Sequence, residues 1–159
     1  MANIPGLSTL GVRLYYGIEE TAGQKPTTWV PLSRVNAIGG ISVDVETIDA
    51  SALEDLTTKS VAGRGDLGGN FPITINVTQD TVDELQTMIQ AYKTAKASQK
   101  QTWFEIYHPD MAEKGAFFVK AEPPMVLPVP ETSQNELWTI ELNMTINELV
   151  GLDTAVIPS

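Results

Sequence analysis

The sequence contains no cysteine, and it has only one histidine and few basic residues. Without cysteine the chain can form neither a disulfide framework nor a thiolate metal site. The single histidine, His108, precedes Pro109 in a predicted turn, where we expect it to be exposed. Zinc sites and nucleophile–histidine pairs would have to be built around this one residue. We therefore predict no catalytic centre, no metal site and no cofactor, and a protein that is not an enzyme.

Positive charge is also scarce. Ten lysine and arginine residues face twenty aspartate and glutamate residues, which gives a formal net charge of -10 and a pI near 4.4. This balance argues against nonspecific adhesion to nucleic acid or anionic lipid, because both need clustered basic side chains. Residues 1–11 lack the pattern of a secretory signal, and no stretch is long and apolar enough to span a bilayer.

The length and composition are those of one globular domain. The chain has 159 residues, of which 42% are hydrophobic and 19% charged. We expect a single domain over 1–159, with an N-terminal arm at 1–10 and a C-terminal tail at 151–159.

Two strand patterns organise the chain. Apolar and polar residues alternate over 41–46, and they alternate again over 71–78. A period of two is typical of a strand with one wet face. The segment between them is too long for a hairpin turn, and it holds apolar residues that a solvated loop does not need.

We predict that residues 48–69 form a long assembly loop that docks on another protein surface. Its glycines would let the backbone turn sharply before the second strand. The residues expected to act in assembly are Ile48, Leu53, Leu56, Val61, Gly65, Asp66, Leu67 and Gly68.

Further strands are predicted at 12–19, 28–38, 103–107, 116–121 and 138–147, and the prolines of 123–130 indicate an edge segment or an extended connection. One amphipathic helix is predicted over 82–97, with a capping box at Thr81 and Glu84. Its buried face would carry Val82, Leu85, Met88, Ile89 and Tyr92. The three tryptophans fall within strand patterns, where we expect burial. The fold class expected is mainly β: a β-sandwich or open barrel of about seven or eight strands with one flanking α-helix and a long inter-strand loop.

Three short patterns suggest chemistry but lack its context. Residues 63–68 match the dinucleotide fingerprint GxGxxG, yet a loop leads in and a strand leads out. Residues 64–66 spell the Arg-Gly-Asp tripeptide of adhesion ligands, a match too short to carry weight. The carboxylates of Asp44 with Glu46 and of Glu54 with Asp55 are interpreted as solvated faces.

The order of elements resembles the tail tube proteins (major tail proteins) of long-tailed bacteriophages. The residues that carry the resemblance are those of 41–49, the Gly65-Asp66-Leu67-Gly68 run, residues 71–77 and the single helix. The resemblance covers almost the whole chain. It implies a structural virion protein that assembles as stacked hexameric rings into a hollow tail tube, the conduit for DNA delivery into the host.

The resemblance also implies the partners. These are other copies of the chain and further tail proteins, namely the tape measure, the tail terminator and the distal tail protein. DNA would pass through the tube without specific binding, no membrane would be involved, and the protein would occur in the virion tail after assembly in the host cytoplasm. Two alternatives remain: a related secretion-system tube ring or tail completion protein, and a monomeric β-sandwich that binds carbohydrate or peptide.

A tube that conducts DNA needs a polar inner wall, and carboxylates there would let DNA slide. The strands at 41–46 and 138–147 are the most regular in the chain, and we expect both in the barrel wall. Asp44, Glu46 and Glu141 are therefore the candidate lumen residues.

Overall fold

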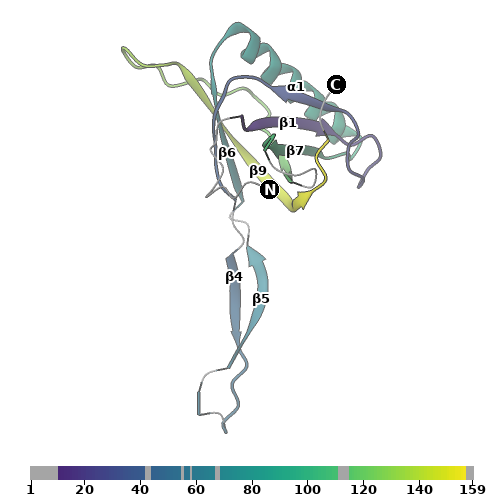
Figure 1. Ribbon diagram of the computed structural model, residues 1–159, viewed down its shortest axis with the longest axis vertical. Coiled ribbons are helices and arrows are strands. Elements are labelled where there is room, and N and C mark those ends of the chain that lie inside the picture. The colour runs from purple at the N-terminus through teal and green to yellow at the C-terminus, as the bar shows by residue number, and fades with distance from the viewer. Residues whose placement is uncertain are drawn as a thin grey trace.

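The computed structural model describes residues 11–41, 44–54, 56–57, 59–66, 69–110 and 115–156, and the side chains at 44–46 and 63–66 lie outside that description. Within it the protein is mainly β, with one helix, as expected (Figure 1). The predicted N-terminal arm lies outside the described residues. The elements are β1 Arg13–Ile18, β2 Trp29–Leu32, β3 Val35–Ile38, β4 Asp44–Asp49, β5 Ser60–Asp66, β6 Asn70–Asn76, α1 Gln79–Ala97, β7 Thr102–Tyr107, β8 Ala116–Glu122 and β9 Thr139–Asp153.

Seven strands form one antiparallel sheet in the order β2-β1-β7-β8-β9-β6-β3. The two edge strands, β2 and β3, follow each other in the chain and are joined by Ser33 and Arg34 alone. Two residues span only a few ångströms, so the two edges of the sheet must approach each other. The sheet therefore curls into an open barrel, which confirms the predicted architecture. The single strand expected over 28–38 is in fact these two strands, and Pro31 lies in an edge strand, where the lost N–H costs nothing.

The main core fills the concave face of the sheet and includes one side of α1. Phe71 of β6 and Phe104 of β7 meet edge to face with ring centroids 6.1 Å apart. The fully buried side chains of this core include Leu14, Phe71, Ile73, Ile75, Leu85, Met88, Ile89, Phe104, Leu142 and Met144. The helix face predicted from the sequence is thus buried, except that Val82 is only half-buried.

The helix begins one turn earlier than predicted. Thr78 is the N-cap, and its hydroxyl accepts from the Thr81 amide at 3.1 Å while the Thr81 hydroxyl accepts from the Thr78 amide at 2.8 Å. The capping box is therefore Thr78 with Thr81, and the proposed pair of Thr81 with Glu84 is wrong. The Glu84 carboxylate instead accepts from the amide and hydroxyl of Ser33, at 3.0 and 2.9 Å. It ties the helix to the connection between β2 and β3.

A second, smaller cluster lies on the opposite face of the sheet. Tyr15, Trp29, Trp103 and Phe118 form this outer aromatic cluster, with Ala116 beside them. Residues 154–156 cross it, and the Val156 amide donates to the Glu105 carboxylate at 2.9 Å. The Lys25 ammonium lies 4.0 Å from the Phe118 ring centre and donates to the Thr154 carbonyl at 2.7 Å.

Three expectations about exposure and boundaries are wrong. His108 is only 6% exposed, because it packs at the end of β7, where its Nδ1 accepts from the Asp110 amide at 3.0 Å. Trp138 is 49% exposed, since it precedes β9 and lies outside the sheet. The C-terminal tail begins later than residue 151, because β9 continues to Asp153.

Candidate assembly surfaces

The predicted assembly loop is a β-hairpin that stands away from the body (Figure 1). We call the two strands β4 and β5, with the tip between them, the arm. Asp44 pairs with Asp66 at its base and Asp49 with Ser60 near its tip, with an irregularity between Val45 and Thr47. β4 and β5 form a two-stranded sheet of their own, separate from the seven-stranded sheet.

Local hydrogen bonds close the tip of the arm. The Ala50 amide donates to the Lys59 carbonyl at 2.8 Å, and the Lys59 amide donates to the Ser51 hydroxyl at 2.7 Å. The Asp49 carboxylate accepts from the Ser51 amide at 2.9 Å, and this bond lowers the pKa of Asp49. These bonds close the base of the tip, and the Asp and Ser side chains that make them favour turns.

The arm joins the body next to Gly39. The Gly39 amide donates to the Pro72 carbonyl at 2.8 Å, and a side chain at Gly39 would collide with the Pro72 ring. Only glycine allows this close approach of β3 to β6. Gly39 thus holds the end of β3 against β6 just before the chain enters the arm.

Apolar side chains of the arm face solvent. Ile48 and Val61 are cross-strand partners and are both about half exposed, while Leu53 and Leu56 at the tip are fully exposed. A lone two-stranded hairpin is only marginally stable in water, and exposed apolar patches mark interaction sites. The arm therefore has the chemistry of a docking element.

The remaining predicted assembly residues are only partly described. Gly65 and Asp66 lie in the backbone of β5 opposite Val45 and Asp44. Leu67 and Gly68 lie outside the described residues. The first half of the GxGxxG match lies in β5, which pairs with β4. It is therefore not a turn that leads into a helix, and the dinucleotide interpretation does not apply.

A second segment leaves the body on another side and was not predicted as an assembly surface. We call residues 123–138, which connect β8 to β9, the projection. It is an extended connection, which is one of the two structures that the prolines of 123–130 indicated. Val126, Val129, Leu137 and Trp138 are exposed on it. The signal that could have revealed it is this run of large apolar residues in a segment too proline-rich for a central strand.

The lumen candidates do not lie on one sheet. Glu141 is exposed on the outer face of β9, opposite Thr74 of β6 and beside Asn143 and Thr145, which are also exposed. Asp44 and Glu46 lie in β4, on the arm, and their side chains are not described. The expectation that both strands belong to the same wall is wrong in this chain, because β4 pairs with β5 alone.

Two buried carboxylates escaped the sequence analysis, because a glutamate in a strand pattern reads as solvent-facing. Burial raises the pKa of Glu105, against the opposing effects of the Val156 amide and Lys25. Burial would also raise the pKa of Glu19, but hydrogen bonds from the Gln101 amide and the Trp103 indole outweigh it and lower that pKa. Both hold the outer aromatic cluster in place.

Neither a cluster of metal-ligating residues nor a membrane-spanning helix occurs in the described part of the chain. No group of three or more histidine, aspartate or glutamate residues there could hold a metal ion. No helix in the same part is long and apolar enough to cross a membrane.

Comparison with solved structures identifies the fold. A chain in the tail of an empty GTA particle, solved with C6 symmetry, matches with a TM-score of 0.56 and 15% identity, over 94% of this chain and 99% of its own. The chain has the fold of this tail protein, which we call the tail-particle fold. A chain in the virion of a native gene transfer agent particle has a TM-score of 0.52 at 15% identity, over 94% of this chain and 99% of its own. A chain in the baseplate of the anti-feeding prophage has a TM-score of 0.52 at 9% identity, over 96% of this chain and 98% of its own.

The tail-particle fold confirms the resemblance inferred from the sequence. At these identities the likeness concerns the fold alone. No family model matches the chain, and no curated protein matches it.

Proposed function

We propose that this protein is a structural subunit of a phage-type tail tube, in which hexameric rings of the chain stack into a hollow conduit for DNA. The observation that carries the proposal is the arm, a hairpin with exposed Ile48, Leu53, Leu56 and Val61 on a tail-particle fold. Such a hairpin needs a surface to dock on, and another copy of the chain would supply one in every ring.

The symmetry of a neighbour supports the ring. The GTA tail was solved with C6 symmetry, so chains of this fold occur in six-fold assemblies. A closed ring removes free sheet edges, and β2 and β3 are such edges here. A repeated contact along the axis would then build a filament from rings.

The role proposed is mechanical rather than catalytic. The subunit would act in the virion tail, after assembly in the host cytoplasm, and the ends of the tube would meet tape measure, terminator and distal tail proteins. The acidic composition suits a wall along which DNA moves without being held.

A ring within a baseplate is a second candidate, because the anti-feeding prophage baseplate also contains this fold. A monomeric binding module is less well supported. Such a module needs converging exposed aromatics, and of the three tryptophans Trp29 and Trp103 are buried in the outer aromatic cluster.

Purified protein tests the proposal directly. We expect size-exclusion chromatography to give species much larger than one subunit, and negative-stain microscopy to show rings or tubes with a central channel. A baseplate ring would give rings that never stack. A single monomeric species at every concentration would overturn the proposal.

A further inference from the structure

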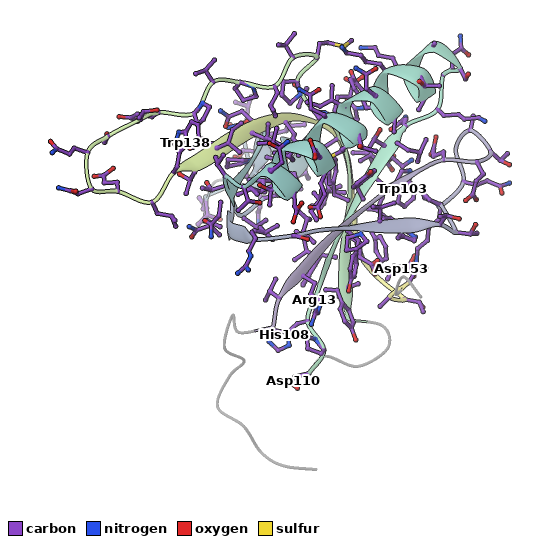
Figure 2. All side chains as sticks on the ribbon, turned by 90° about the horizontal axis from the view of Figure 1, so that it is seen from above. Arg13, Trp103, His108, Asp110, Trp138 and Asp153 are labelled. Carbon is purple, nitrogen blue, oxygen red and sulfur yellow. The ribbon has the colours of Figure 1, made fainter. Side chains whose placement is uncertain are left out.

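Two surface features outside the arm lie on opposite sides of the body. The projection leaves on the side of Trp138, whereas the C-terminal half of α1 and the loop between β1 and β2 lie on the other side (Figures 1 and 2). Since the body separates them, the two features of one copy cannot meet each other. They are therefore available to neighbouring copies.

The tip of the projection is apolar with an acidic border. Val129 is 93% exposed and Leu137 is also exposed, whereas the exposed Trp138 lies at the base of the projection. The exposed Glu131 and Glu136 belong to the same tip. The Trp138 carbonyl accepts from the Val77 amide at 2.9 Å, so the base of the projection is fixed next to the start of α1.

The opposite side holds an open groove of about 940 Å³ between α1 and the pair β1–β2, which we call the α1 groove. Its lining includes Tyr16, Val30, Gln90, Ala91, Thr94 and Lys100. Val30, which belongs to an edge strand, is 41% exposed. A groove of this size can receive several side chains of a partner.

Lys100 is the one basic side chain in the lining of the α1 groove, and it offers a binding partner for an acidic residue of another copy. Lys100 has no ion-pair partner within the described residues, whereas Lys25, Lys96 and Lys120 are all paired. Glu19 and Glu20 also border the groove, but both carboxylates accept hydrogen bonds within the chain. Glu19 binds Trp103 at 2.9 Å, and Glu20 accepts from the Thr27 hydroxyl at 2.8 Å.

A cyclic ring needs two different patches on each subunit, one for each neighbour. We propose that the tip of the projection of one copy docks in the α1 groove of the next copy in the same ring, with Glu131 and Glu136 facing Lys100. The inference rests on the proposed ring assembly. The arm points in another direction from the body, so it remains free for contacts between rings (Figure 1).

Disulfide trapping tests the contact cleanly, because the wild-type chain has no cysteine. The double variant Val129→Cys with Thr94→Cys places one thiol on the projection and one in the α1 groove. The control pair, Val129→Cys with Lys93→Cys, places the second thiol on an exposed helix position that does not line the groove. After mild oxidation of assembled protein, we expect a ladder of covalent oligomers from the first pair and not from the control.

The outcomes separate the contact from the ring itself. Rings or tubes with no ladder from the groove pair, or with equal ladders from both pairs, would overturn the contact and leave the proposed function standing. Absence of any ring or tube by microscopy would overturn both.

Charge reversal gives an independent readout. Glu131→Lys with Glu136→Lys should raise the protein concentration needed for assembly about tenfold, because like charges would then meet at Lys100. Adding Lys100→Glu should restore most of that loss. If the triple variant assembles no better than the double variant, Lys100 does not face these glutamates.

Discussion

At the scale of single residues, two buried glutamates, Glu19 just after β1 and Glu105 in β7, have pKa values shifted in opposite directions. Glu19 is charged because three donors, the amides of Gln101 and Gly23 and the Trp103 indole, surround its carboxylate. Glu105 has one donor, the Val156 amide, and its other oxygen has no partner among the described atoms. The number of donors therefore decides which form of a buried carboxyl is favoured.

The pKa of Glu105 makes a prediction about pH. Because this pKa is raised in the folded state, Glu105 contributes stability below its unfolded pKa, and that contribution is lost as pH rises through the folded pKa. We therefore expect Glu105→Gln to gain stability relative to wild type as pH rises from about 4 to 8. Urea denaturation of both proteins across this range measures the difference. A difference that stays constant with pH would contradict the raised pKa.

Glu19 predicts the opposite response. Its folded pKa is lowered, so its contribution is present above the unfolded pKa and is lost as pH falls through the folded value. At neutral pH, Glu19→Gln should cost about 1–3 kcal/mol, because an amide group would face donors that need an acceptor. Urea denaturation at neutral and acidic pH measures this cost. Glu20→Gln, on the exposed side of the same turn, is the control, and an equal cost for both would contradict the assignment.

A third residue-scale prediction concerns the helix core. Leu85 is fully buried between α1 and the sheet, so Leu85→Ala should cost about 2–5 kcal/mol of unfolding free energy. The exposed neighbour Gln86 provides the control, and Gln86→Ala should change stability little. Denaturation should use subunits that do not assemble, such as the arm variant below. A small loss at Leu85 would mean that the helix does not pack on the sheet.

At the scale of elements, most strands and the helix followed from their periodicity. β6 and the first half of β9 alternate cleanly because one face is buried, and α1 shows its apolar stripe. The pairing of the arm did not follow from periodicity. Ile48 and Val61 face each other across its two strands, but neither strand packs a face on the core that would fix their register. The split between β2 and β3 was also hidden, since it depends on which distant strand each one meets.

The candidate sites show the same division. Exposed apolar residues in the arm could be found from the sequence, because Leu53 and Leu56 stand out in a turn-like segment. The exposure of Trp138 could not, since its alternation with Ile140 is that of a buried strand residue. Burial of His108 depends on packing at the end of β7, which no local pattern encodes.

The arm carries the main element-scale prediction. Leu53→Ser with Leu56→Ser should leave the body folded, because neither side chain packs on it, and should abolish polymerisation. The control Glu54→Gln with Thr57→Ser changes the same tip without removing a large apolar side chain. Circular dichroism checks the fold, and sedimentation checks assembly. Normal tubes from the serine variant would mean that the arm has another role.

At the scale of the whole molecule, the lumen wall remains a prediction. Glu141, Asn143 and Thr145 form a polar row on the outer face of β9, whereas Asp44 and Glu46 lie on the arm. The two sets can therefore be tested separately, which the sequence alone did not allow.

Changing lumen carboxylates to lysine should make assembled tubes retain DNA, and retention should weaken as salt rises. If the β9 row lines the channel, Glu141→Lys with Asn143→Lys will have this effect. If the arm lines it, Asp44→Lys with Glu46→Lys will have it. Retention of a labelled duplex after salt washes measures the difference, with Asp83→Lys on the exposed side of α1, outside both sets, as the control. No retention by either variant would remove all three residues from the wall.

The position of β9 also links synthesis of the chain to assembly. β9 comes last in sequence among the strands described, yet it lies between β8 and β6 in the sheet. Strand pairing connects β6 and β3 to the other strands only through β9. The arm is strung between β3 and β6. Until residues 139–153 have left the ribosome, the arm is attached to only half a sheet. A chain that stops before residue 139 therefore has no finished body on which to carry the arm, and we expect such a chain to be excluded from the assembly proposed above.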